Sequence, residues 1–186
     1  MTTTKRFKIF TSYAHADELY LLEFRQHLKS LEDEGLIESF NDKAILGGQN
    51  WDDKIKQELE KADIILFLLS KDFVWSNYIH DVEIKKALDR YYTQGNILLI
   101  PIYIKPYRYS SQLISQFQGF PDPVKPVSLW GEDRDSAWVI VVDGIAKCIK
   151  EMQNKVKENH KSKENLNQES TLKPQNGYKR ISASKK

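Results

Sequence analysis

The stretch "DIILFLLS", residues 63–70, is apolar without interruption between its first and last residues. An unbroken apolar strand of this length is typical of a parallel sheet that helices cover on both faces. "NILLIPIYI" at 96–104 has the same character, and Phe7, Ile9 and Thr11 begin a third strand-like segment near the start of the chain. These segments predict a parallel β-sheet.

Helical patterns separate the strands. Apolar residues recur at helical spacing in four stripes: Leu21, Phe24, Leu28 and Leu31; Trp51, Ile55, Leu59 and Ala62; Ile84, Ala87, Leu88 and Tyr91; and Trp138, Val141, Val142, Ile145, Ile149 and Met152. Two further short strands are expected at "LIESF", 36–40, and "PVSLW", 126–130. The alternation of strands and helices predicts an α/β fold with a flavodoxin-like strand order.

The composition limits the classes of protein. The 186 residues suffice for one domain, with 40% apolar and 29% charged residues. The single cysteine, Cys148, excludes a disulfide within the chain, and the four histidines lack the spacing of zinc ligands, so no metal site is expected. No apolar run is long enough for a membrane span, and "MTTTKRFK" has no apolar signal region. We expect a cytoplasmic protein without membrane contact.

Charge is distributed unevenly along the chain. The last 37 residues carry a net charge of +6 and the preceding 149 carry −4. A slightly acidic body argues against nucleic acid as a partner of the folded part. Apolar periodicity fades near Asn154, so we expect a folded domain over 1–154 and a basic tail over 155–186 that is largely disordered after an extra turn or two of the last helix.

Polar residues follow the first strand directly. Ser12, Tyr13 and His15 lie within "TSYAHAD", immediately before the first helical stripe. In open α/β sheets, ligands bind beyond the carboxyl ends of the strands. These three residues are therefore candidate site residues.

The loop "FNDKAILGGQNW", 40–51, contains two glycines but lacks the Lys-Ser/Thr ending of a phosphate-binding loop. It carries Asp42 near its start and Trp51 at its end. Each has an alternative interpretation: Asp42 as a turn residue, and Trp51 as a core residue of its own helical stripe.

Glu83 lies at the edge of the stripe that begins at Ile84. A carboxylate at this position fits a cleft, where its pKa would be raised or its charge unpaired. The alternative is a boundary residue that pairs with Lys86 or Lys54.

Three motifs, in this order and spacing, resemble a Toll/interleukin-1 receptor (TIR) domain of the bacterial type. They are "KIFTSYAHAD", "FNDKAILGGQNWDDKI" and "ADIILFLLSKDFVWSNYIHDVEI". The resemblance covers about residues 5–152 and implies a five-stranded parallel sheet flanked by helices. It also implies one of two functions: cleavage of NAD+ at the nicotinamide–ribose bond, or association with other TIR domains.

The enzymatic TIR domains use a glutamate on the helix after the third strand, and Glu83 occupies that place. By the same resemblance, the residues expected to bind the substrate are Ser12, Tyr13, His15, Asp42 and Trp51. Tyr78 stands where some relatives carry a cysteine, a change expected to affect packing more than chemistry.

The preferred hypothesis is an NAD+ glycohydrolase or cyclase that serves as an effector of bacterial antiphage immunity. It would use NAD+ as substrate without a cofactor, and would be activated by TIR–TIR self-association or by a sensor or activator protein. One alternative is a non-catalytic TIR interaction module. Another is a receiver-like signalling domain, for which Lys105 is suitably placed but His15 and Asp17 form a poor acidic pair.

Overall fold

The computed structural model describes residues 5–39, 51–76, 79–95, 97–108 and 113–171. The chain divides into two compact units, Met1–Ile149 and Lys150–Lys186. This division falls slightly before the predicted domain boundary at residue 154. The first unit contains the sheet and the site.

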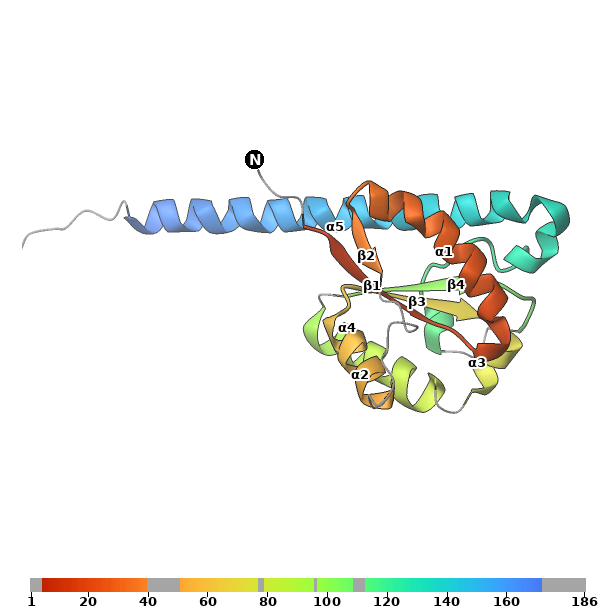
Figure 1. Ribbon diagram of the computed structural model, residues 1–186. Helices are drawn as coiled ribbons and strands as arrows, with labels where there is room; N and C mark the ends of the chain where they lie inside the picture. Colours follow the sequence, from red (N-terminus) through yellow and green to blue (C-terminus); the bar gives the residue numbers. More distant parts are fainter. Residues whose placement is uncertain (1–4, 40–50, 77–78, 96, 109–112, 172–186) are drawn as a thin grey trace, which may run out of the picture. The chain divides into compact units, whose positions relative to one another are not determined.

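The sheet of the first unit has four parallel strands in the order β2-β1-β3-β4. They are β1 (Phe7–Ser12), β2 (Ile37–Ser39), β3 (Ile64–Leu69) and β4 (Leu98–Tyr103). All six residues of β3 are buried, as the unbroken apolar run predicts. The predicted α/β architecture, a parallel sheet flanked by helices, is confirmed (Figure 1).

The prediction of a strand at 126–130 is wrong. Val127–Asp133 forms a 3₁₀ helix, η5. Beside β4, a single bridge between Ile102 and Phe120 takes the place of a fifth strand, with Phe120 N donating to Pro101 O at 2.9 Å. Proline lacks the N–H that a ladder needs, and Pro121 follows Phe120 directly, so the pairing cannot extend.

Helices form where the apolar stripes predict them, and several short helical segments occur in addition. The helical elements are η1 (His15–Asp17), α1 (Glu18–Asp33), α2 (Trp51–Lys61), α3 (Lys71–Trp75), η3 (Ile79–Ile84), α4 (Lys85–Gln94), η4 (Leu113–Gln116) and α5 (Arg134–Thr171). The buried residues of α1 are the four of its predicted stripe. Gly35 adopts a positive φ of 70° just after α1, which lets the chain turn into β2.

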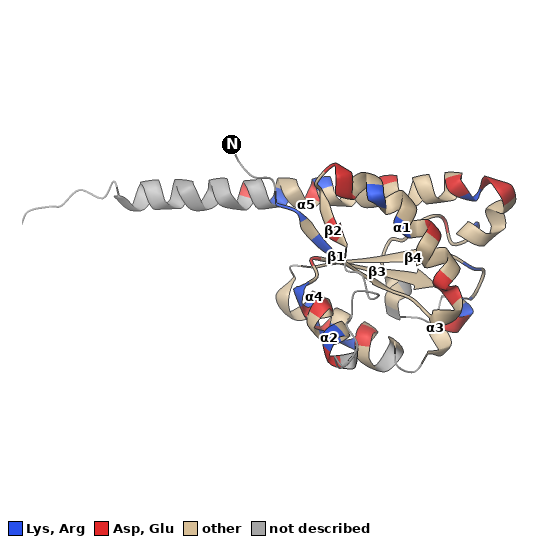
Figure 2. Ribbon diagram, in the orientation of Figure 1, with Lys and Arg blue, Asp and Glu red and all other residues tan. Residues whose placement is uncertain are grey.

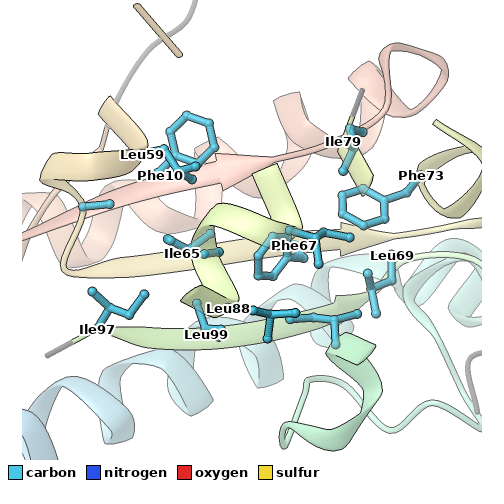
Figure 3. Packing of buried hydrophobic residues seen from close by; sticks show 14 of the residues in the cluster. Phe10, Leu59, Ile65, Phe67, Leu69, Phe73, Ile79, Leu88, Ile97 and Leu99 are labelled. Carbon is cyan, nitrogen blue, oxygen red and sulfur yellow. The ribbon is translucent and has the colours of Figure 1, made fainter. Parts of the chain in front are cut away.

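Helices cover both faces of the sheet. α1 lies on one face together with the first part of α5, and α2 and α4 lie on the other (Figure 1). On the α2–α4 face, Ile65, Phe67 and Leu99 of the sheet pack in one cluster with Leu59 and Leu88 of the helices (Figure 3). Figure 2 shows that β3 and β4 carry no charged residue, while charged residues lie mainly on the helices.

On the α1 face, Trp138 of α5 is the largest fully buried side chain. Its ring stacks on Phe24 of α1, with the centroids 5.2 Å apart. Its indole N–H donates to Glu23 Oε2 at 3.1 Å, so the polar atom of this buried ring is satisfied. Arg134 Nη1 binds the other oxygen of Glu23 at 2.7 Å, which joins the start of α5 to α1.

The second unit differs from the predicted disorder. α5 continues to Thr171, so residues 155–171 are helical, while 172–186 lie outside the described residues. Extending an existing helix costs far less than nucleating a new one, and no Gly or Pro occurs between 150 and 171. None of the helices in the described part of the chain combines the length and apolar character that crossing a membrane requires.

Candidate functional site

A cavity of about 400 Å³ lies at the carboxyl end of β1. It is lined by the end of β1 and the following turn, by Arg25 of α1 and Ile55 of α2, and by four residues that follow β3: Asp72, Ser76, Ile79 and Glu83. This volume lies within the range of small-molecule sites in proteins. The position is the one that an open α/β sheet predicts.

The unequal lengths of β1 and β2 account for this position. Pairing between them ends at Ile9 and Ser39, whereas β1 continues, paired with β3, to Ser12. Among the described residues, the last part of β1 therefore has a strand neighbour on one side, β3, and it also borders the cavity. This is why Arg25 and Ile55, from helices on opposite faces of the sheet, line the same space.

Glu83 is the acidic group at the centre of the site. It belongs to η3, a π-helical segment, and only 6% of the residue is exposed. Burial disfavours the ionised form and raises the pKa of Glu83 to about 7, although the nearby Ser12 hydroxyl opposes this rise. At neutral pH the carboxyl is thus poised between its two protonation states.

Ser12 is the last residue of β1 and is only 2% exposed. Its Oγ and Glu83 Oε2 are buried and, among the described residues, have no hydrogen-bond partner. The Ser12 hydroxyl and the Glu83 carboxyl are close to each other, but they do not have the geometry of a normal hydrogen bond. Leaving a buried polar group unsatisfied costs about 1–3 kcal/mol. Two such atoms facing one cavity are typical of a ligand site.

The alternative interpretation of Glu83 as a paired boundary residue is wrong. Lys86 Nζ binds Glu60 Oε1 at 2.5 Å, and Lys54 Nζ binds Glu58 Oε1 at 3.0 Å. Both lysines thus pair with carboxylates of α2. Glu83 instead lies against the cavity.

Tyr13 and His15 also line the cavity, as the sequence predicts. Their rings meet edge to face, with the centroids 6.0 Å apart. Tyr13 is half-buried and His15 is exposed, so together they form part of the cavity's outer wall. The structure therefore brings Ser12, Tyr13, His15 and Glu83 together at one site.

The remaining predicted residues cannot be placed. Asp42 and Tyr78 lie outside the described residues, as do Gly47 and Gly48 of the same loop as Asp42. Trp51 begins α2, but its side chain lies outside the described part. Their roles stay predictions.

A second polar cluster lies at the same edge of the sheet. The pairing of its residues is not predicted from the sequence. Asp17 is fully buried and accepts a hydrogen bond from Ser70 Oγ. Lys105 Nζ lies 2.5 Å from Asp17 Oδ1 and 3.6 Å from Asp72 Oδ2. Burial lowers the pKa of Lys105, but Asp17 and then Asp72 outweigh it, so the net direction is upward.

This cluster, Asp17, Ser70, Asp72 and Lys105, connects the ends of three strands. Asp17 follows β1, Ser70 and Asp72 follow β3, and Lys105 follows β4. A signal was present in the sequence, because each of these residues lies just beyond a predicted strand. A receiver-like domain needs an acidic cluster after its first strand that can reach a ligand, whereas Asp17 here is fully buried and paired with Lys105.

No group of three or more His, Cys, Asp or Glu side chains converges as metal ligands would, within the residues that the structure describes. The described wall of the cavity offers the carboxyl of Glu83, the hydroxyl of Ser12, and aromatic and basic groups.

Comparison with known families identifies the chain. A family model described as "TIR domain" matches residues 9–139, a range that includes every described residue of the cavity. The chain belongs to the TIR domain family. This confirms the resemblance that the three sequence motifs carry.

One relative of this TIR domain is an uncharacterized protein, y4lF, of Sinorhizobium fredii (strain NBRC 101917 / NGR234). The two are 31% identical over 148 residues, which cover 80% of this chain and 44% of the relative. The chain thus spans less than half the length of this relative. The family includes NAD+-cleaving enzymes as well as interaction modules, so family membership leaves both functions open.

Burial of Glu83 makes stability depend on pH. Its pKa of about 7 in the folded state exceeds the value of 4.5 that is usual for a glutamate. Its contribution to stability is therefore complete below the unfolded pKa and is lost as the pH rises through 7. Glu83→Gln cannot ionise, so between about pH 5 and pH 9 we expect it to gain on the order of 2–3 kcal/mol in unfolding free energy relative to wild type. Denaturant unfolding at both pH values measures this difference.

Glu60→Gln is the matched control, because Glu60 is exposed and a hydrogen bond from Lys86 lowers its pKa. It should show no gain at high pH. The same pH dependence in wild type and Glu83→Gln would contradict the raised pKa of Glu83.

Proposed function

We propose that this TIR domain cleaves NAD+ at the bond between nicotinamide and ribose. The observation that carries the proposal is the buried carboxyl of Glu83, which lines a cavity beside the unpartnered Ser12 hydroxyl. The place of Glu83 after the third strand agrees with that of the catalytic glutamate in enzymatic TIR domains.

The reaction makes modest demands on the protein. Nicotinamide is cationic while bound to ribose, so the C–N bond can break with its electron pair moving to the ring nitrogen and without a general acid. The ribose is left with oxocarbenium character, which a carboxylate stabilises. Water, or a nucleophilic nitrogen of the adenine ring, then adds to the anomeric carbon. Addition of water releases one proton to solvent or to Glu83.

The raised pKa of Glu83 suits this role. An empty cavity favours the neutral acid because burial penalises the charge. A cationic nicotinamide ring beside the carboxyl would favour the ionised form, so that the substrate itself would generate the catalytic charge. Tyr13 in the cavity wall offers an aromatic face or edge for the ring.

We further propose an effector role in bacterial immunity, in the cytoplasm, where unregulated loss of NAD+ would be toxic. Control would come from TIR–TIR assembly or from a sensor or activator protein. TIR domains generally self-associate, which supports the first route. The product, ADP-ribose or a cyclic isomer, depends on which nucleophile reaches the anomeric carbon.

A non-catalytic interaction module is the second candidate function. Large apolar side chains are exposed on two helices of the same face: Leu19 of α1 is 75% exposed and Val139 of α5 is 50% exposed. Such side chains are available for contacts between domains. An interaction module, however, has no need of a buried, unpartnered carboxyl in a cavity.

One incubation separates the two candidates. Concentrated and dilute protein are mixed with NAD+, the products are identified by chromatography and mass spectrometry, and oligomer size is measured in parallel. We expect nicotinamide and an ADP-ribose product, with specific activity rising as the protein assembles. Intact NAD+ with fully assembled protein would favour the interaction module. Full activity in dilute monomer would contradict control by assembly and leave the cleavage proposal in place.

A further inference from the structure

The two walls of the cavity carry groups of opposite type, acidic on one side and basic on the other. The acidic groups, Asp72 and Glu83, both come from the segment that follows β3. The basic groups, His15 and Arg25, come from the turn after β1 and from α1. NAD+ has the same polarity, because its nicotinamide ring is cationic and its diphosphate is anionic.

Arg25 is the group of the basic wall that suits a diphosphate. Its guanidinium stays charged at every physiological pH and presents paired N–H donors that match phosphate oxygens. Lys105 is also near this edge of the sheet, but it is not among the residues that line the cavity. Among the described residues that line the cavity, Arg25 is the one lysine or arginine.

The topology separates Arg25 from Glu83. Arg25 enters the cavity from α1, on one face of the sheet, and Glu83 enters from η3, which leads into α4 on the other face (Figure 1). A ligand that contacts both must extend past the end of β1. A dinucleotide is elongated and carries its diphosphate some distance from the nicotinamide ring, so it matches this arrangement.

We propose that Arg25 binds the diphosphate group of a dinucleotide whose nicotinamide end lies at Glu83. The identity of the reacting ring rests on the proposed function, whereas the diphosphate subsite rests on the charge and place of Arg25. The subsite gives the cavity specificity for nucleotides with a diphosphate over nucleosides that lack one.

The test uses ADP-ribose as the probe, because it carries the diphosphate but has no nicotinamide bond to cleave. Titration calorimetry on the full chain compares wild type with Arg25→Gln. We expect ADP-ribose to bind about 10- to 100-fold more weakly to Arg25→Gln, the scale of a lost charge-assisted contact. Adenosine, which has no phosphate, should bind both proteins equally.

Lys29→Gln is the matched control. Lys29 lies one helical turn after Arg25 on α1, outside the cavity, and its side chain is mostly exposed beside Asp33. The Lys29→Gln substitution removes one positive charge from the same helix, and it should leave the affinity for ADP-ribose unchanged. Equal weakening by Lys29→Gln and Arg25→Gln would mean long-range electrostatics and would overturn the subsite. Unchanged binding by Arg25→Gln, or no binding by wild type, would also overturn it.

Arg25→Lys serves as a second variant in case Arg25→Gln misfolds. The melting temperature of each variant shows whether it is folded. Arg25→Lys keeps the charge but loses the paired donors, so we expect binding about three- to tenfold weaker than wild type. If Arg25→Gln does not fold, equal affinity of Arg25→Lys and wild type overturns the proposal.

NAD+ cleavage, measured on the same samples, keeps this inference distinct from the proposed function. Cleavage by wild type together with unchanged ADP-ribose binding by Arg25→Gln overturns the subsite alone. ADP-ribose binding that depends on Arg25, without any cleavage, supports the subsite and contradicts the proposed reaction.

Discussion

Glu83→Gln should reduce the turnover of NAD+ by about 10²–10³-fold or more, the scale on which enzymes lose a group that stabilises developing charge. The substitution keeps the size and polarity of the side chain and removes the negative charge that the oxocarbenium-like ribose requires. Because the side chain is buried and lacks an ion-pair partner among the described residues, the fold should survive. Product formation by wild type and Glu83→Gln, at equal concentration and equal oligomer size, measures the effect.

Glu60→Gln again provides the control, since it removes one carboxylate from an exposed site on α2, away from the cavity. It should cleave NAD+ at the wild-type rate. Wild-type turnover by Glu83→Gln would remove Glu83 from the mechanism, even if the protein is an NAD+-cleaving enzyme.

Lys105→Met should lower the unfolding free energy by about 3 kcal/mol, because removing the partly exposed lysine leaves the charge of the buried Asp17 uncompensated. Asp17 is fully buried, and Lys105 Nζ lies 2.5 Å from its Oδ1. Methionine keeps most of the length of the lysine stem, so lost charge rather than lost packing dominates. Denaturant unfolding at neutral pH measures the change.

Lys61→Met is the surface control: its partner Glu58 is within 3.1 Å, but the Lys61 side chain is half-exposed. It should change stability by less than about 1 kcal/mol. Adding Asp17→Asn to Lys105→Met should restore part of the loss, because the isolated buried charge is then absent. If Lys105→Met alone is as stable as wild type, then the lysine does not stabilise the buried carboxylate of Asp17.

Strand identity could be predicted because it depends on local pattern. The unbroken apolar run at 63–70 produced β3, and the stripe beginning at Leu21 produced α1 with its predicted buried face. The strand expected at 126–130 failed because strand pairing is not local. The pairing with β4 forms instead as a single bridge between Phe120 and Ile102. Pro121 prevents this bridge from extending into a strand.

The site was predictable in part. Ser12, Tyr13 and His15 follow a strand, and Glu83 lies at the boundary of an apolar stripe, so simple rules placed all four. The sequence could not give the pKa of Glu83, because that depends on what buries it. Nor could it pair Lys105 with Asp17, since the two are 88 positions apart and meet only when β1 and β4 lie in one sheet.

The π-helical geometry of η3 has a consequence for how this site tolerates change. A π-turn holds one more residue than an α-turn, and in a regular helix each residue rotates the next by about 100°. A deletion before Glu83 that the segment did not absorb by relaxing to α geometry would turn Glu83 by about 100°, away from the cavity wall. The direction of Glu83 is therefore sensitive to the deletion or insertion of one residue in this segment. Conservative substitutions of its side chains would leave that direction unchanged.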